Sequence, residues 1–127
     1  MKRFLYCSYR EESFSMMSFI DMLEKAKLKN EKLNVNGILV YDKKEFLQII
    51  EGEDSAIDSL VDSILKDSRH RDIKTIFDGA VQEKRYPRWF MKYFDAGTLK
   101  QIGVLNDFSP RYMSVDDVIA VFDKLNA

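Results

Sequence analysis

The chain has 127 residues, which is enough for one domain with a single hydrophobic core and too few for two. Lysine and arginine number 20 and aspartate and glutamate 21, so the charge balance argues against binding the phosphate backbone of nucleic acids. No apolar run approaches the roughly 20 residues that span a bilayer, so we expect no membrane insertion. The one cysteine, Cys7, rules out an internal disulfide and suits a reducing compartment, which predicts a cytoplasmic protein.

The first elements predicted are a strand and a helix. Residues 3–8 follow the alternation of a strand that has Tyr6 and Ser8 on one face. A helix then runs to about Asn30, with Ser13 or Ser15 as its N-cap. Its apolar stripe, at spacings of three and four, consists of Met16, Phe19, Ile20, Leu23 and Ala26.

The middle of the chain predicts a hairpin and a second helix. Residues 35–41 and 45–51 read as two strands joined by a short polar link. Asp54 or Ser55 is expected to cap the helix that follows. The apolar residues of this helix again recur at helical spacing, which predicts one face buried against the sheet.

Two more strands and a helical tail complete the prediction. Residues 73–81 form a fourth strand, and residues 89–94 form a fifth, with Pro87 at its entrance. Ser114 and Asp117 resemble a capping box at the start of a tail helix. The order β-α-β-β-α-β matches the ferredoxin-like arrangement, so we expect an α+β domain with a mixed sheet. Two helices should cover one face and the C-terminal helices the other, because a sheet with two apolar faces must bury both.

Three polar side chains occupy positions where the pattern favours apolar ones. Asn30 continues the stripe of the first helix, while Gln48 and Tyr6 lie in the middle of the third and first strands. A buried polar group without a partner costs about 1–3 kcal/mol, so each needs one. If the first and third strands are neighbours, the three groups converge on a space that a planar heteroaromatic ring with carbonyls and ring nitrogens would fill. The alternative is that Gln48 bonds Tyr6 and a water molecule, or faces solvent.

Five short motifs follow one another between residues 1 and 95. They are Tyr6-Cys7-Ser8, Asn30 with Asn36-Gly37-Ile38-Leu39-Val40-Tyr41, Phe46-Leu47-Gln48-Ile49-Ile50-Glu51-Gly52, Asp67-Ser68-Arg69-His70, and Arg85-Tyr86-Pro87-Arg88-Trp89-Phe90-Met91. In this order they resemble the motifs of the BLUF family, the sensors of blue light using flavin adenine dinucleotide. Each motif alone is common, whereas five in the right order and on the predicted elements are specific.

The sequence departs from the family pattern at a few positions. Where Thr, Leu and Phe are commoner, this chain has Asn36, Ile50 and Tyr86. None of these changes removes a residue that the family's photochemistry is thought to need. Lys29, before Asn30, occupies a position that varies in the family.

The resemblance implies a role for each motif residue. Tyr6 would donate an electron coupled to its proton, and Gln48 would relay the change between the phenol and the flavin. Ser8, Trp89 and Met91 would form the switch, with Ser8 bonding Trp89 or the backbone when Trp89 is near. The implied flavin-binding residues are Tyr6, Lys29, Asn30, Gln48, Ile64, Asp67, Arg69 and His70.

Plainer roles stay open for several of these residues. Asp67, Arg69 and His70 would also suit a solvated helix end. Trp89 and Met91 would also suit an ordinary core, and the sequence does not decide which of them lies near the flavin.

The resemblance further implies a photosensory flavoprotein of the short, stand-alone type rather than an enzyme. Residues 1–97 would form the flavin-binding domain and residues 98–127 a helical extension packed on the sheet. FAD is the family's usual flavin, and FMN or riboflavin would also fit, because the sequence has no Gly-rich phosphate cradle. We expect no metal, no nucleic acid and no membrane, but a light-dependent contact with a downstream signalling protein or a homo-oligomer.

Two other functions on the same fold compete with this interpretation. An acylphosphatase-like hydrolase would need a glycine-rich anion loop between the first strand and helix, and the sequence has none there. A flavin-free ferredoxin-like interaction module is the second. Its RNA-binding form is disfavoured by the near-zero charge and the missing aromatic signature.

Overall fold

The structure is a computed structural model that describes residues 1–13 and 15–127. Its elements are, in order, β1 Lys2–Arg10, α1 Met16–Leu33, β2 Asn36–Tyr41, β3 Glu45–Gly52, α2 Asp54–Lys66, β4 His70–Ala80, β5 Lys92–Asp95, α3 Ala96–Gln101, the 3-10 helix η1 Pro110–Tyr112 and α4 Val115–Asn126. This succession confirms the predicted α+β class. Within these ranges, no helix is long and apolar enough to cross a membrane.

The strands form one mixed sheet in the order β4-β1-β3-β2-β5. β1 runs antiparallel to both β3 and β4, and β2 and β3 form an antiparallel hairpin. β5 lies parallel to β2 at one edge of the sheet. The first four strands have the ferredoxin-like arrangement, which confirms that the first and third strands are neighbours. In this register Tyr6 lies directly opposite Gln48.

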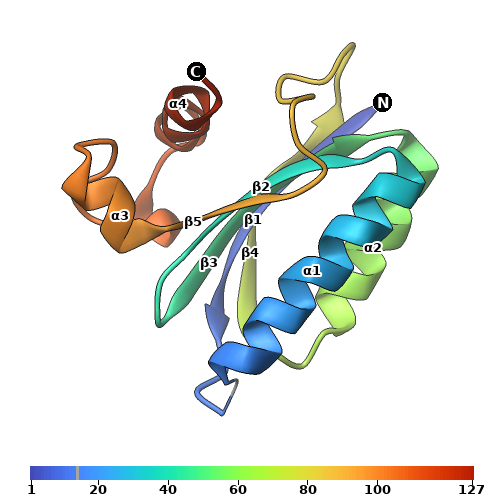
Figure 1. Ribbon diagram of the computed structural model, residues 1–127. Coiled ribbons are helices and arrows are strands. Elements are labelled where there is room, and N and C mark those ends of the chain that lie inside the picture. The colour runs from blue at the N-terminus through green and yellow to red at the C-terminus, as the bar shows by residue number, and fades with distance from the viewer. Residues whose placement is uncertain (14) are drawn as a thin grey trace.

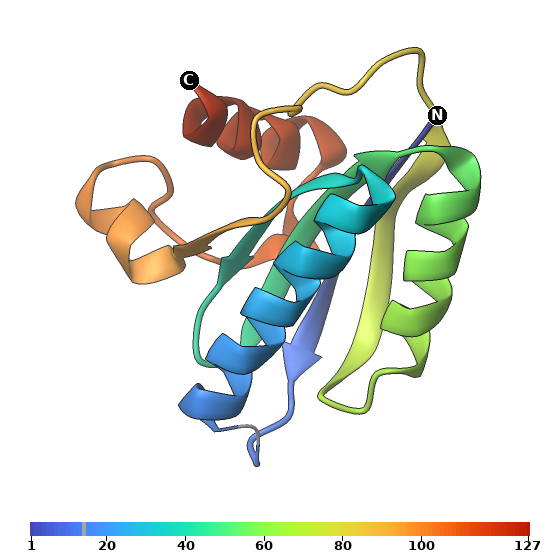
Figure 2. The same cartoon turned by 45° about the vertical axis from the view of Figure 1, so that its right-hand side comes forward.

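Helices cover both faces of the sheet, as Figures 1 and 2 show. α1 and α2 lie side by side over one face, and α3 and α4 lie on the other. Along β1, Phe4 and Tyr6 face α2, while Leu5 and Cys7 face α4. α4 buries Val118, Val121, Phe122 and Leu125 against the sheet. Full burial of Phe122 alone contributes about 1.5–3 kcal/mol, so the apolar core holds α4 in place.

The ends of the helices confirm some of the predicted caps and correct others. Ser15 caps α1 and Ser114 caps α4, each hydroxyl accepting a hydrogen bond from a backbone N–H three residues later. The prediction for α2 is wrong, because its N-cap is Glu53, whose side chain makes no capping bond. Asp54 instead forms an ion pair of 2.8 Å with the N-terminal ammonium group.

The buried line of α1 is narrower than predicted. Phe19, Leu23 and Asn30 are buried, whereas Met16 and Ile20 are more than half exposed. The predicted stripe was too wide, because Ile20 is rotated around the helix away from the line that faces the sheet, and Met16 is the first residue of the helix.

The fifth strand is shorter than predicted. β5 begins at Lys92, so Trp89 and Met91 precede it and do not alternate along one strand face as expected. The Trp89 carbonyl instead accepts hydrogen bonds from the Gly37 backbone N–H at 3.1 Å and from Nδ2 of Asn36 at 3.0 Å. These bonds attach the segment to β2 before regular pairing begins.

Candidate functional site

A hydrogen bond joins the two polar side chains of the central strands. Tyr6 on β1 and Gln48 on β3 lie on the sheet face covered by α1 and α2, and the Tyr6 hydroxyl donates to Oε1 of Gln48. Tyr6 is only 4% exposed, and Gln48 is half-buried. Because this bond fits both interpretations of the sequence, the space beside it decides between them.

Burial controls the ionisation of Tyr6. Loss of hydration raises the pKa of its phenol far above the ordinary value of about 10, and the Asp67 carboxylate raises it further. The hydroxyl is therefore protonated at neutral pH and is the donor in its bond to Gln48.

This shift predicts how Tyr6 behaves in alkaline solution. We expect no Tyr6 phenolate in the folded protein at about pH 10, where an ordinary tyrosine is half ionised. Because the folded state favours the neutral phenol, the contribution of Tyr6 to stability is complete below about pH 10 and is lost as the pH rises toward its folded-state pKa. The difference in phenolate absorbance between the wild type and Tyr6→Phe reports the ionisation of Tyr6. Circular dichroism, recorded at each pH, shows whether the protein is still folded. If this difference in absorbance appears near pH 10 while the protein is still folded, the predicted rise in the pKa of Tyr6 is contradicted.

Met91 contacts the other side of the Gln48 amide. Its Sδ lies 3.9 Å from Nε2 of Gln48, a distance suited to a weak N–H···S hydrogen bond. Trp89 lies on the opposite side of the sheet, where it packs against Phe94 in the core beneath α4. In this structure Met91, and not Trp89, is therefore the neighbour of Gln48.

A cavity of about 240 Å³ lies beside this pair, between α1 and α2. The structure brings all eight residues of the expected flavin-binding set together around it. The other residues that line it are Met22, Leu23, Lys25, Ala26, Leu39, Phe46, Ile50, Leu60 and Met91.

The chemistry of the cavity suits a flat heteroaromatic ring. Leu23 of α1 and Ile64 of α2 supply apolar surface. The amides of Asn30 and Gln48 and the guanidinium of Arg69 supply hydrogen-bonding groups. An apolar space with a few convergent polar groups is typical of a cofactor site, so these residues fit a flavin.

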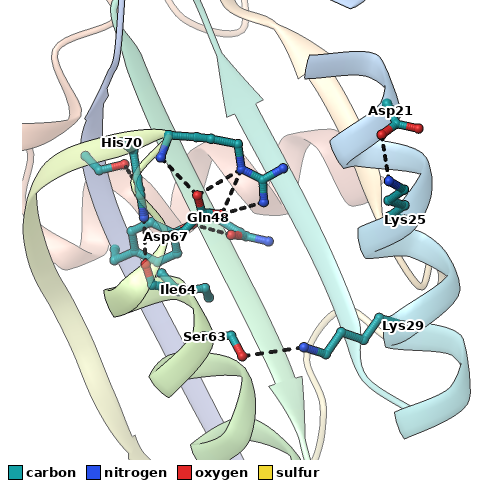
Figure 3. A network of polar contacts seen from close by, with 11 residues as sticks. Asp21, Lys25, Lys29, Gln48, Ser63, Ile64, Asp67 and His70 are labelled. Atoms are coloured by element: carbon teal, nitrogen blue, oxygen red, sulfur yellow. Dashed lines mark hydrogen bonds and ion pairs between the residues drawn. The ribbon is translucent and has the colours of Figure 1, made fainter. Parts of the chain in front are cut away.

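The outer part of the cavity is charged. Figure 3 shows Lys29 extending from α1 toward Ser63 of α2, with Nζ 3.5 Å from the serine Oγ. Lys25, one turn earlier, forms an ion pair of 2.9 Å with Asp21. Because both lysines are exposed, this part of the cavity faces solvent while the part beside Tyr6 is buried.

Asn30 is 3% exposed and connects α1 to the segment that carries Met91. Its Nδ2 donates a hydrogen bond of 2.7 Å to the carbonyl of Phe90. An amide has a second N–H and an oxygen, which can serve the edge of a ligand. Asn30 therefore has a structural partner that the sequence did not predict, in addition to its place in the cavity wall.

Asp67 and Arg69 form a bidentate ion pair after α2. Nε and Nη2 of Arg69 lie 2.8 and 2.5 Å from the two carboxylate oxygens. The guanidinium lowers the pKa of the Asp67 carboxyl below its ordinary range, chiefly through these hydrogen bonds. Asp67 thereby fixes the Arg69 guanidinium at the cavity wall.

Ser8 bonds His70, a partner that the sequence did not predict, and the bond to Trp89 expected when that residue is near does not form in this arrangement. Its Oγ lies 2.7 Å from Nδ1 of His70, and Nε2 of the same ring lies 2.7 Å from the carbonyl of Ile64. A carbonyl only accepts, so in the neutral ring Nε2 carries the proton and Nδ1 accepts from Ser8. The physical reason is position, because Trp89 packs on the far side of the sheet while His70 begins the strand beside β1.

Several cavity residues were missed by sequence reasoning, although spacing offered a signal for some. Phe46 lies two residues before Gln48 and therefore on the same face of β3. Met22 and Lys25 precede Ala26 and Lys29 by four residues, which places them on one side of α1. Leu39 could not be found in this way, because the buried strand β2 is apolar on both faces.

Comparison with known proteins gives the family. The family described as sensors of blue light using FAD, BLUF, matches residues 1–92. A photoactivated adenylate cyclase subunit alpha of Euglena gracilis is 32% identical over 94 residues, which are 72% of this chain but 9% of that protein. The blue light- and temperature-regulated antirepressor BluF of Escherichia coli (strain K12) is 26% identical over 121 residues, 94% of this chain and 27% of its own length. The chain therefore spans only a small part of these relatives.

Solved structures agree with this assignment over nearly the whole chain. BlrB, a BLUF protein in its dark state, superimposes with a TM-score of 0.88 at 25% identity, covering 98% of this chain and 94% of its own. The photo-activated state of BlsA gives a TM-score of 0.83 at 28% identity, covering 98% and 93%. The chain belongs to the BLUF family of blue-light photoreceptors, and its fold is the one that family uses.

Proposed function

We propose that the cavity holds a flavin ring and that Tyr6 and Gln48 convert the absorption of blue light into a change of hydrogen bonding. The observation that carries this proposal is the Tyr6–Gln48 bond in the wall of a cavity lined by every expected flavin-binding residue. FAD is the proposed flavin, in line with the family's description. FMN and riboflavin offer the same ring to the same groups and are the alternatives.

The roles proposed for the cavity residues follow from their chemistry. Leu23 and Ile64 would contact the faces of the ring. Asn30 and Arg69 would serve its polar edges, since an amide both donates and accepts and a guanidinium donates from several N–H groups. Gln48 would lie between these groups and the Tyr6 hydroxyl.

The photochemical step proposed here uses the protonated Tyr6 phenol. When bound, the flavin supplies the absorption of blue light and an acceptor for one electron. A phenol that loses an electron becomes strongly acidic, so Tyr6 passes its hydroxyl proton to Oε1 of Gln48, with which it is already hydrogen-bonded. The amide then flips or changes tautomer, because it can both donate and accept. Return of the electron and a proton to Tyr6 would restore the neutral phenol, while the changed arrangement of the amide would persist until it reverts in the dark.

The same amide connects the cavity to the segment before β5. In the present arrangement Nε2 of Gln48 faces Met91 Sδ at 3.9 Å. A flip would place an oxygen against the sulfur, which is only a weak acceptor, and would remove this N–H···S contact. Gln48 therefore gives Met91 a different neighbour in the light, which is the proposed first step of signalling.

For the output, we favour a light-dependent contact with another protein over an activity of this chain's own. Among its relatives, the Escherichia coli protein is named as an antirepressor and the Euglena gracilis proteins as cyclase subunits. The proposed partners are a downstream signalling protein or further copies of the chain. In this proposal residues 1–97 form the sensor, and residues 98–127 form the extension that responds. A cytoplasmic location fits the buried, unpaired Cys7.

The spectrum of the purified protein tests the proposed function. We expect the protein purified with FAD to be yellow and to shift its absorption to longer wavelength under blue light, with full recovery in the dark. A colourless protein that does not retain FAD, FMN or riboflavin would support the flavin-free interaction module instead. A yellow protein without a reversible shift would contradict the sensor mechanism while leaving the cofactor site intact.

A further inference from the structure

The loop between β4 and β5 is bonded to a buried carboxylate of β3 that the proposed photochemistry does not use. Glu51, at the end of β3, is 1% exposed. Its carboxylate accepts the backbone N–H of Arg85 at 3.0 Å and that of Tyr86 at 2.8 Å, and it pairs with Nε of Arg3 at 2.8 Å. A buried carboxylate needs such partners, so Glu51 fixes the backbone of residues 85 and 86 to the central sheet.

The side chains of the same two residues reach α4. Nε and Nη2 of Arg85 contact the two carboxylate oxygens of Asp123 at 2.9 and 2.8 Å. The Tyr86 hydroxyl donates to Oδ1 of Asp123 at 2.8 Å and lies 3.3 Å from the carbonyl of Ile119. Figure 2 shows the loop after β4 running past α4 before it turns into β5. The loop is therefore tied to the sheet by its backbone and to α4 by its side chains.

The other end of this loop forms part of the cavity wall. The Phe90 carbonyl accepts a hydrogen bond from Asn30, and Met91 Sδ faces the amide of Gln48. Only four residues separate Tyr86 from Met91, so a displacement of Met91 acts on a short segment whose far end is bonded to Asp123.

The Tyr86 hydroxyl is a departure from the family motif that the sequence resembles, in which Phe is commoner at this position. The ring is 1% exposed and packs against Phe122, which a Phe side chain would do equally well. The hydroxyl adds the bond to Asp123 and the contact with the carbonyl of Ile119, and both of these lie on α4.

We propose that the Tyr86–Asp123 hydrogen bond couples the state of the cavity to the docking of α4, with Glu51 as the fixed point and Tyr86 as a positioning residue. The proposal rests on the proposed function, because light must first displace Met91. Coupling is reciprocal: if the light state weakens this bond, then removing the bond stabilises the light state relative to the dark state.

Tyr86→Phe tests the coupling in the full-length protein loaded with FAD. We expect an unchanged red shift and a slower dark recovery, because the hydrogen bond that would re-form on the way back to the dark state no longer favours that return. The expected factor is about two- to tenfold, to which the net contribution of one hydrogen bond corresponds. In the wild type we expect light to increase amide hydrogen exchange in α4. In Tyr86→Phe the exchange in the dark should already be raised, so the light-induced difference should shrink. Tyr112→Phe removes an exposed hydroxyl from η1 and is the matched control.

Asp123→Asn is the second variant, with Asp116→Asn on the same helix as its control. It should slow recovery in the same direction, because its uncharged amide keeps only one acceptor oxygen and loses the bidentate ion pair with Arg85 that holds this side chain beside Tyr86. A normal red shift with wild-type recovery in both Tyr86→Phe and Asp123→Asn would overturn this inference alone. The inference would also be overturned if amide hydrogen exchange in α4 of the wild type were the same in light and dark. A wild type without any red shift would overturn the proposed function, and this inference with it.

Discussion

Tyr6→Phe is expected to retain the flavin and to lose the red-shifted light state completely. The Phe ring fills the same buried volume, but it has no hydroxyl to donate to Gln48 and no proton to release when an electron is removed. Loss of one hydrogen bond should lower the free energy of unfolding by only about 0.5–1.5 kcal/mol, so the variant should fold. Absorption spectra before and during blue illumination, with the flavin-to-protein ratio measured beforehand, report the result.

The control for this variant is Tyr9→Phe, a substitution of the same kind three residues later on β1. Its ring lies near the guanidinium groups of Arg71 and Arg111 and outside the cavity, so it should keep the full red shift. A normal photocycle in Tyr6→Phe would refute the role of Tyr6 as the electron and proton donor.

Gln48→Leu is also expected to lose the red-shifted light state, for a different reason. Leucine keeps a side chain of similar size but removes the acceptor of the Tyr6 proton and the donor that faces Met91. The buried Tyr6 hydroxyl is then left without its acceptor, which should destabilise the protein by about 1–3 kcal/mol. Spectra under illumination and a urea titration measure the two effects separately.

Gln101→Leu in α3 is the matched control, because this glutamine is exposed and on the opposite side of the sheet. It should leave the red shift unchanged. A full wild-type shift in Gln48→Leu would show that the amide is not the relay, and the Tyr6 hydroxyl would then need another partner.

Much of the fold could be predicted because its pattern is local. The hairpin of β2 and β3 and the caps Ser15 and Ser114 depend on residues a few positions apart, and the structure confirms them. The strand β5 could not be delimited, because Trp89 and Met91 have strand-like composition but their segment is attached to β2 by the side chain of Asn36. A contact of this kind joins residues about 50 positions apart and leaves no local signal.

The centre of the candidate site was visible as polar residues in apolar surroundings. Gln48 and Tyr6 stand out because a strand gives each a fixed face, and the pairing of β1 with β3 then brings them opposite each other. The partner of Ser8 could not be predicted, because it depends on where β4 begins and on which side of the sheet Trp89 packs. Glu51 was also overlooked, although a carboxylate beside two isoleucines is the same kind of signal as Gln48.

The edge strand β5 pairs with the sheet on one side only, through four residues opposite β2. The remaining strands, in the order β4-β1-β3-β2, complete the ferredoxin-like unit without it. A displacement of β5, the strand that follows Met91, would therefore leave the pairing of the central strands and their contacts with α1 and α2 in place. If light moves Met91 and the strand that follows it, as proposed above, such a receptor would go through many cycles of illumination without loosening its own framework, because the segment that moves would not be the one on which the rest depends.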